Sequence, residues 1–249
     1  MIDIENLTVK YHHHIALYGA NLHIPKGSIC GLVGMNGSGK STLFKAIMGF
    51  VPATTGRVLI GGMGVQRAQQ LHLVAYMPQS EQVDWQFPVV VEEVVMMGRY
   101  GKMNWLRQPS PCDRALVRAS LERVGLLSVV DRQIGELSGG QKKRVFMARA
   151  LAQQSPLLLL DEPFGGVDIT TEKSLIELLL DLRHQGYTIL ISTHNLESIS
   201  TFCDRTVLIN RTILAYGTTQ EVFTTENLAK VFLNSPSSAQ ESVRRTILP

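Results

Sequence analysis

Long apolar runs and cysteines are both scarce in this chain of 249 residues. No apolar stretch approaches the roughly 18 residues that a membrane-spanning helix needs, and the densest one stops at Asp161 and Glu162. The three cysteines, Cys30, Cys112 and Cys203, lie far apart, so no pair has the spacing of metal ligands. The first residues lack the basic stretch and apolar core of a secretory signal. We therefore expect a cytosolic chain from a reducing compartment.

An excess of charge of either sign is also missing. The 24 Lys and Arg residues against 21 Asp and Glu leave a net charge of +3, too small to indicate binding to nucleic acid. Apolar residues make up 45% and charged residues 18%, which is ordinary for a globular protein and excludes a disordered chain or a coiled coil. The length is enough for one substantial core.

Apolar patterning predicts strands that alternate with helices along most of the chain. After two strands in the first 24 residues, we expect strands over residues 28–33, 57–60, 74–77, 157–160, 187–191, 207–209 and 213–216. We expect helices over residues 42–48, 89–97, 141–153, 171–183 and 196–202. Between residues 80 and 134 helical signals dominate, with Ser110 and Pro111 as a helix start. The alternation predicts a parallel sheet covered on both faces, with an inserted helical region.

A glycine-rich turn follows the strand expected over residues 28–33. It reads Gly34-Met35-Asn36-Gly37-Ser38-Gly39-Lys40-Ser41 and fits the pattern G-x-x-x-x-G-K-[ST] at every fixed position. In such a turn, main-chain N–H groups converge on a phosphate chain, and the following helix points its positive end at the same phosphates. Lys40 would reach the terminal phosphates and Ser41 would bind Mg²⁺. The motif predicts a phosphate-binding loop.

Two carboxylates end the apolar run of residues 157–160. A buried parallel strand brings its carboxyl end to the ligand edge of the sheet, so Asp161 would hold Mg²⁺ through water and Glu162 would act as a general base toward water. Taken alone, the pair reads equally well as a solvated strand end. The phosphate-binding loop earlier in the chain favours the functional interpretation.

A second candidate anion site is the run Leu137-Ser138-Gly139-Gly140-Gln141, which opens a helix. From the residues alone, a glycine-rich helix cap is an equal alternative. The run resembles the signature motif of the ABC-transporter ATPases, and it lies between the phosphate-binding loop and Glu162 in the order that this family uses. The resemblance covers about residues 1–225.

Other positions can then be matched to the family's motifs. Tyr11 resembles the aromatic residue that stacks on adenine, Gln79 resembles the glutamine that contacts Mg²⁺ and water and faces the membrane partner, and His194 resembles the histidine that contacts the γ-phosphate. Asp168 resembles the aspartate of the D-loop, although Gly165 and Gly166 replace the usual serine-alanine pair. The resemblance implies that nucleotide is bound by Tyr11, Gly34, Asn36, Gly37, Ser38, Gly39, Lys40, Ser41, Thr42, Ser138, Gly139, Gly140, Gln141 and Asp168. It implies catalytic roles for Glu162, His194 and Gln79, and Mg²⁺ contacts from Ser41, Gln79 and Asp161.

The family resemblance also carries expectations for fold and assembly. It implies an α/β P-loop NTPase fold with a RecA-like parallel sheet core, an N-terminal antiparallel β-subdomain and a helical subdomain inserted at about residues 81–140. One domain would span residues 1–233, and residues 234–249 would form a loosely ordered tail. ATP and Mg²⁺ are the implied cofactors. Two copies would pair head to tail, each ATP lying between the phosphate-binding loop of one copy and Ser138 of the other.

The helical region narrows the resemblance further. The runs Val83-Asp84-Trp85-Gln86-Phe87-Pro88 and Met96-Met97-Gly98-Arg99-Tyr100-Gly101-Lys102, with Trp105-Leu106-Arg107, resemble ATPase subunits of importers for manganese, chelated iron and zinc. The implied partners are integral membrane permease subunits and a periplasmic or surface metal-binding protein. The chain would then lie on the cytoplasmic face of the cell membrane. From the residues alone, a Met-rich helix is more often core than docking face, and His12-His13-His14 is read as a solvated turn, since adjacent side chains on an extended segment alternate faces.

A soluble ABC ATPase in iron–sulfur cluster assembly is the alternative function. Relatives that act in DNA repair insert long coiled coils, and the interval between the phosphate-binding loop and Ser138 contains no heptad run. Relatives that act in translation carry two ATPase cassettes, whereas this chain has one phosphate-binding loop. A permease partner or a soluble scaffold would distinguish the importer from the assembly factor.

Overall fold

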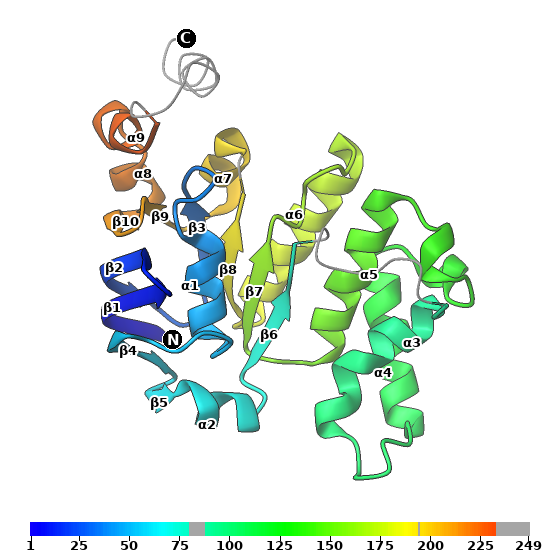
Figure 1. Ribbon diagram of the computed structural model, residues 1–249. Coiled ribbons are helices and arrows are strands. Elements are labelled where there is room, and N and C mark those ends of the chain that lie inside the picture. The colour runs from blue at the N-terminus through cyan, green and yellow to red at the C-terminus, as the bar shows by residue number, and fades with distance from the viewer. Residues whose placement is uncertain (80–87, 194, 233–249) are drawn as a thin grey trace.

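The computed structural model describes residues 1–79, 88–193 and 195–232. Within these ranges the chain forms one lobe that contains both sheets and a second, helical lobe. In Figure 1 the helical lobe lies on the right, beside the parallel strands of the six-stranded sheet. The tail at residues 234–249, His194 and most of the run at residues 83–88 lie outside the described residues.

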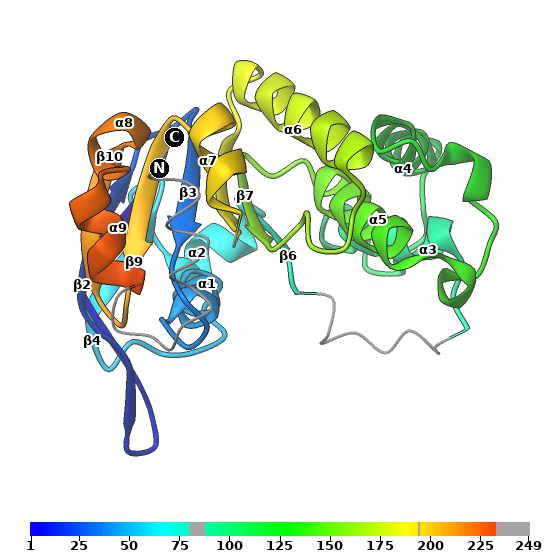
Figure 2. The ribbon, with the colours of Figure 1, turned by 90° about the horizontal axis from the view of Figure 1, so that it is seen from above.

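A six-stranded sheet with the order β10-β9-β3-β8-β7-β6 forms the centre of the molecule. Every neighbouring pair is parallel except β9 and β10. Its strands are β3 (Ile29–Val33), β6 (Val74–Met77), β7 (Leu157–Asp161), β8 (Thr188–Ser192), β9 (Arg205–Ile209) and β10 (Ile213–Thr218). All residues of β3, β7 and β8 are buried, as expected for central strands covered on both faces. Seen from above, α1 (Lys40–Ile47) lies on one face, and α6 (Ile169–His184) and α7 (Leu196–Phe202) lie on the other (Figure 2).

A four-stranded antiparallel sheet, in the order β2-β1-β4-β5, packs beside α1. It contains β1 (Ile2–Tyr11), β2 (His14–Ile24), β4 (Thr55–Ile60) and β5 (Met63–Gly64). The break in the apolar alternation between Ile4 and Leu7 coincides with a register shift in the pairing of β1 with β2. The chain thus keeps Ile2, Ile4, Leu7 and Val9 inside despite the change of period.

The helical lobe is inserted between β6 and β7. It consists of α3 (Val91–Met96), the 3₁₀ helix η2 (Met97–Lys102), α4 (Pro111–Arg123), the 3₁₀ helices η3 (Leu127–Val129) and η4 (Ile134–Glu136), and α5 (Gly139–Ala152). The expected start of α4 is confirmed, because Ser110 is its N-cap and Pro111 follows directly. Beyond η2, the side chain of Trp105 is 91% exposed.

Several short elements were not expected from the sequence. Helix α2 (Val65–Gln70) has only Ala68 buried, so its apolar period is too weak to predict a helix. The helix expected over residues 89–97 is shorter, because the chain tightens into η2 at Met97. After β10 the chain forms α8 (Thr219–Val222) and α9 (Thr225–Phe232).

Two apolar clusters stabilise the fold, one on each face of the parallel sheet. Alternate residues of β3 separate them: Cys30 and Leu32 pack with α1 and the antiparallel sheet, while Ile29 and Val33 pack toward the helical lobe and α6. This arrangement fixes the carboxyl ends of β3, β6, β7 and β8 at one edge. Among the helices within the described residues, none combines the length and the apolar character needed to cross a membrane.

Candidate functional site

The turn between β3 and α1 can be made only with glycine at several positions. Gly37 and Gly39 have φ values of 77° and 100°, in the left-handed region that side chains disfavour. A Cβ on Gly39 would also lie 2.6 Å from the Leu17 side chain, and a Cβ on Gly34 would lie 2.4 Å from the main-chain oxygen of Ile209. The glycines of the motif therefore allow the turn to pack closely against β2 and β9.

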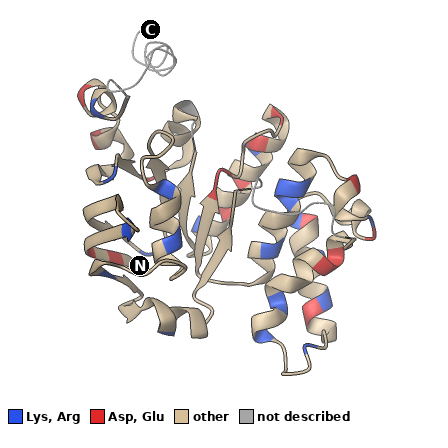
Figure 3. Ribbon diagram, viewed as in Figure 1, with Lys and Arg blue, Asp and Glu red and all other residues tan. Residues whose placement is uncertain are grey.

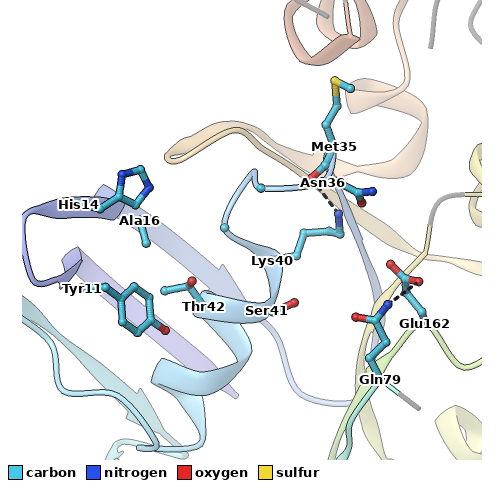
Figure 4. A pocket seen from close by; sticks show the side chains of 12 residues that line it. Tyr11, His14, Ala16, Met35, Asn36, Lys40, Ser41, Thr42, Gln79 and Glu162 are labelled. Carbon is cyan, nitrogen blue, oxygen red and sulfur yellow. Dashed lines mark hydrogen bonds between the residues drawn. The ribbon is translucent and has the colours of Figure 1, made fainter. Parts of the chain in front are cut away.

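A pocket of about 510 Å³ opens above this turn, within the usual size range of ligand sites. Its walls come from β1 and β2, the turn, the start of α1, and the ends of β6 and β7 (Figure 4). The lining residues are Tyr11, His14, Ala16, Met35, Asn36, Gly37, Gly39, Lys40, Ser41, Thr42, Gln79 and Glu162. Most of these were predicted from the sequence as site residues, whereas His14, Ala16 and Met35 were not.

Lys40 is 6% exposed and has its ammonium group close to the turn. Its Nζ donates to the main-chain oxygens of Gly34, at 2.6 Å, and Met35, at 3.1 Å. Burial lowers the pKa of Lys40, while Glu162 and Asp161 oppose that shift. The lysine is thus a desolvated cation bonded to carbonyl groups, which an anionic ligand in the pocket can replace.

Ser38 is buried inside the turn. Its side chain is 2% exposed, and its hydroxyl has no hydrogen-bond partner. This hydroxyl faces the close contact of Gly34 with β9 and does not line the pocket. The glycine turn and the Lys40 ammonium are the groups that suit the oxygens of a phosphate chain.

Glu162 stands at the opposite wall of the pocket, and Asp161 is buried just before it at the end of β7. Burial raises the pKa of Asp161, and a hydrogen bond from Ser192 opposes that shift. The hydroxyl of Tyr76 lies 3.5 Å from Oδ2 of Asp161, and Nε2 of Gln79 lies 3.5 Å from Oε2 of Glu162. Figure 3 shows a basic residue at the start of α1 and acidic residues beyond β7, so charges of both signs meet at this edge.

The run beginning at Ser138 forms a capped helix start away from the pocket. Ser138 accepts from the main chain of Gln141 at 3.2 Å, and Gln141 accepts in return from the main chain of Ser138 at 3.0 Å. The N-terminus of α5 lies at the same edge of the molecule as the phosphate-binding turn, across the gap between the lobes (Figure 1). No residue of this run lines the 510 Å³ pocket.

Asp168 also lies outside the pocket. It is the N-cap of α6, and its carboxylate accepts from the main chain and the hydroxyl of Thr171, at 2.9 Å and 2.7 Å. These hydrogen bonds lower the pKa of Asp168. The structure thus brings together the turn, Tyr11, Gln79 and the two acids, but keeps Ser138 and Asp168 apart from them.

Two residues near the acids were missed by the sequence analysis. Ser192 and Tyr76 reach Asp161 from the strands on either side of β7. The only available signal was a polar side chain within or at the end of each of two mainly apolar strands.

Comparison with known proteins places this geometry in a family. The family model described as ABC transporter matches residues 17–165. The chain is 61% identical to the manganese transport system ATP-binding protein MntA of Synechocystis sp., over 94% of this chain and 91% of that protein. It is 58% identical to the chelated iron transport system membrane protein YfeB of Yersinia pestis, over 92% of this chain and 78% of that protein.

A solved structure shares the fold. It is an inward-facing transporter described as of the metal-chelate ABC type; its matching chain is 28% identical, with a TM-score of 0.81, over 93% of this chain and 88% of that one. The expected fold class is thereby confirmed. The family model covers more than half of this chain, and both relatives match nearly all of it. The chain belongs to the ABC transporter family, as one of its ATP-binding, ATP-hydrolysing subunits.

Proposed function

We propose that this chain powers the uptake of a transition-metal ion, which is manganese, iron or zinc, through a membrane permease. The observation that carries the proposal is the high identity, over more than nine-tenths of the chain, to ATP-binding proteins of manganese and chelated iron transport systems. The alternative, iron–sulfur cluster assembly by a soluble ATPase, has no support among these relatives. In this proposal the chain works at the cytoplasmic face of the cell membrane, together with permease subunits and a periplasmic or surface metal-binding protein.

The pocket provides the binding part of the reaction. Tyr11 would stack on adenine, while the turn at residues 34–42, including Lys40, would hold the phosphates. Ser41, Asp161 and Gln79 offer the oxygen ligands that Mg²⁺ prefers beside substrate phosphates, so this set fits the ion. When bound, Mg²⁺ would neutralise phosphate charge. Glu162 would accept a proton from the attacking water, and Gln79, which contacts its carboxylate, would orient it.

Assembly into a pair of chains would complete the site. The helix start at Ser138 shares the pocket's edge yet does not line the pocket, so a second copy turned head to tail could present Ser138, Gly139, Gly140 and Gln141 to the same phosphates. Hydrolysis would remove the charge that holds both helix starts, which would open the pair. We assign residues 1–233 to one ATPase domain and keep the expected helical subdomain at about residues 81–140, with α5 (Gly139–Ala152) extending the helical lobe beyond that bound.

Replacing the proposed base tests the catalytic assignment. Glu162→Gln should lower the rate of ATP hydrolysis about 10²- to 10⁴-fold, since the amide cannot take a proton, while ATP binding is retained. The control is Glu177→Gln, the same chemical change on the exposed face of α6, which should leave the rate unchanged. Hydrolysis at the normal rate by Glu162→Gln would refute the assignment, and failure of the unmodified chain to bind ATP would refute the proposed function.

The cross-chain site has its own test. Ser138→Arg should leave ATP binding by the single chain intact but prevent the ATP-dependent dimer, measured by size-exclusion chromatography in the Glu162→Gln background. Ser110→Arg is the matched control, because Ser110 caps α4 in the same way that Ser138 caps α5. The Ser110→Arg variant should lose a helix cap of similar strength and still form the ATP-dependent dimer. A normal dimer with Ser138→Arg would count against the shared site.

A further inference from the structure

Ser192 connects the two acidic residues at the end of β7. It is the last residue of β8, fully buried, and it stands opposite Asp161 in the parallel register. Its hydroxyl donates to Oδ1 of Asp161 at 2.6 Å and accepts from the main-chain N–H of Glu162 at 3.1 Å. One side chain therefore contacts both residues.

The bond to Asp161 fixes the plane of that carboxylate. The terminal torsion of an aspartate is broad and roughly two-fold, so the strand alone does not set it. The 2.6 Å bond from Ser192 is short and charge-assisted, whereas the Tyr76 hydroxyl is 3.5 Å from the other oxygen, at the limit of a hydrogen bond. The Ser41 hydroxyl also hydrogen-bonds this carboxylate, but its effect on the Asp161 pKa is smaller than that of Ser192. Ser192 is therefore the strongest of the three orienting groups.

The contact with Glu162 holds an unfavourable backbone conformation. Glu162 has a φ of 52°, in the left-handed region that residues with a Cβ rarely adopt. Its N–H is shared between the hydroxyl of Ser192 and the main-chain oxygen of the same residue, at 3.1 Å and 3.2 Å. This turn takes the chain off β7 and sends the Glu162 side chain into the pocket, where it faces Gln79 (Figure 4).

Ser155 shows what a buried serine with a structural contact looks like in this chain. It is also fully buried, just before β7, and its hydroxyl donates at 2.7 Å to the main-chain oxygen of His72. Ser192 has the same burial and a bond of similar length, but its acceptor is the Asp161 carboxylate, next to the pocket-lining Glu162. The difference between the two lies in what each hydroxyl positions.

We propose that Ser192 is a positioning residue, whose hydroxyl orients the Asp161 carboxylate toward Mg²⁺ and holds the turn that directs Glu162 at the attacking water. The inference rests on the proposed roles of Asp161 and Glu162. It predicts that loss of the hydroxyl affects the metal-dependent part of nucleotide binding and the catalytic rate, while metal-free nucleotide binding through Lys40 stays unchanged.

The test compares Ser192→Ala with Ser155→Ala in the full chain. Binding of Mn²⁺ in the presence of a non-hydrolysable ATP analogue is followed by electron paramagnetic resonance, and binding of the same analogue without metal is measured separately. Ser192→Ala should weaken Mn²⁺ binding about tenfold and lower kcat about tenfold or more, with metal-free binding unchanged. Ser155→Ala should lower the melting temperature as much as Ser192→Ala does, but it should change neither Mn²⁺ binding nor kcat.

A second pair keeps the test valid if alanine disturbs the strand. Threonine and valine have the same shape, so Ser192→Thr and Ser192→Val differ only in the hydroxyl. Ser192→Thr should retain Mn²⁺ binding and Ser192→Val should lose it. Equal Mn²⁺ binding in this pair, or equal effects of Ser192→Ala and Ser155→Ala, would overturn the inference. If either result occurred while Glu162→Gln was still inactive in ATP hydrolysis, the role of Ser192 would be refuted and the proposed function would be retained.

Discussion

Each lobe of the molecule buries a cation and a carboxylate, but their surroundings are opposite. In the helical lobe, Arg99 donates to Asp113 at 2.9 Å and to the main-chain oxygen of Ala152 at 2.9 Å, and both charged side chains are about nine-tenths buried. Beside the sheet, Lys40 bonds only carbonyl groups among the partners described, and burial raises the pKa of Asp161.

The contrast separates a structural pair from a site prepared for a ligand. Hydrogen bonds from Ser110 and Arg99 lower the pKa of Asp113 to about 2, so the network is complete without any other molecule. Around Lys40, the burial that lowers the lysine pKa means that the folded chain carries an electrostatic cost. A bound polyphosphate would offset that cost.

Breaking the structural pair should have the largest effect on stability. Arg99→Ala leaves the Asp113 carboxylate buried without its cation, so the free energy of unfolding should fall by about 3–5 kcal/mol in denaturant titrations at neutral pH. Arg57→Ala is the control, because its ion pair with Glu5 is exposed and should contribute less than about 1 kcal/mol. A similar small loss in both variants would remove the distinction between the two clusters.

Removing the Lys40 ammonium should have the opposite result, with a large effect on ATP binding and a small effect on stability. Lys40→Met should weaken ATP binding about 10- to 100-fold, because a charged hydrogen bond to phosphate is lost. Without nucleotide, its free energy of unfolding should stay within about 1 kcal/mol of the unmodified chain, because the burial cost of the ammonium disappears as well. Calorimetric titration with ATP and thermal unfolding would check the two halves. A large loss of stability would make Lys40 a structural residue like Arg99.

Acid should weaken the structural pair by a smaller amount. A carboxylate whose pKa is lowered by folding stabilises the fold at any pH above its pKa in the unfolded chain. That contribution is lost as the pH falls toward its pKa in the folded chain. For Asp113 the loss, about 2 kcal/mol, should develop between about pH 4 and pH 2. Asp113→Asn should remove this component from the pH dependence of unfolding. An identical acid transition in both proteins would contradict the assignment to Asp113.

Sequence patterns predicted well those parts of the fold that depend on local order. The phosphate-binding turn, the apolar run of β7 and the cap at Ser110 are each encoded by neighbouring residues, and each lies where it was expected. The break in the alternation of β1 also had a structural counterpart, in the register shift against β2.

Contacts between distant strands could not be predicted in the same way. Ser192 meets Asp161 only because β8 pairs with β7 in one register, which no local pattern specifies. His14 was expected in a solvated turn; it is exposed, as expected, but it also lines the pocket because β2 folds back along β1. The roles assigned to Ser138 and Asp168 depend on a second chain, and His194 lies outside the described residues, so these remain predictions.

The exposed tip of the helical lobe also has a practical consequence. Trp105 is one of two tryptophans in the chain, and 91% of its side chain is in contact with solvent. In a Trp85→Phe background, all indole emission would come from this tip. A blue shift on adding detergent-solubilised permease would therefore report directly that a partner covers Trp105, with no attached dye.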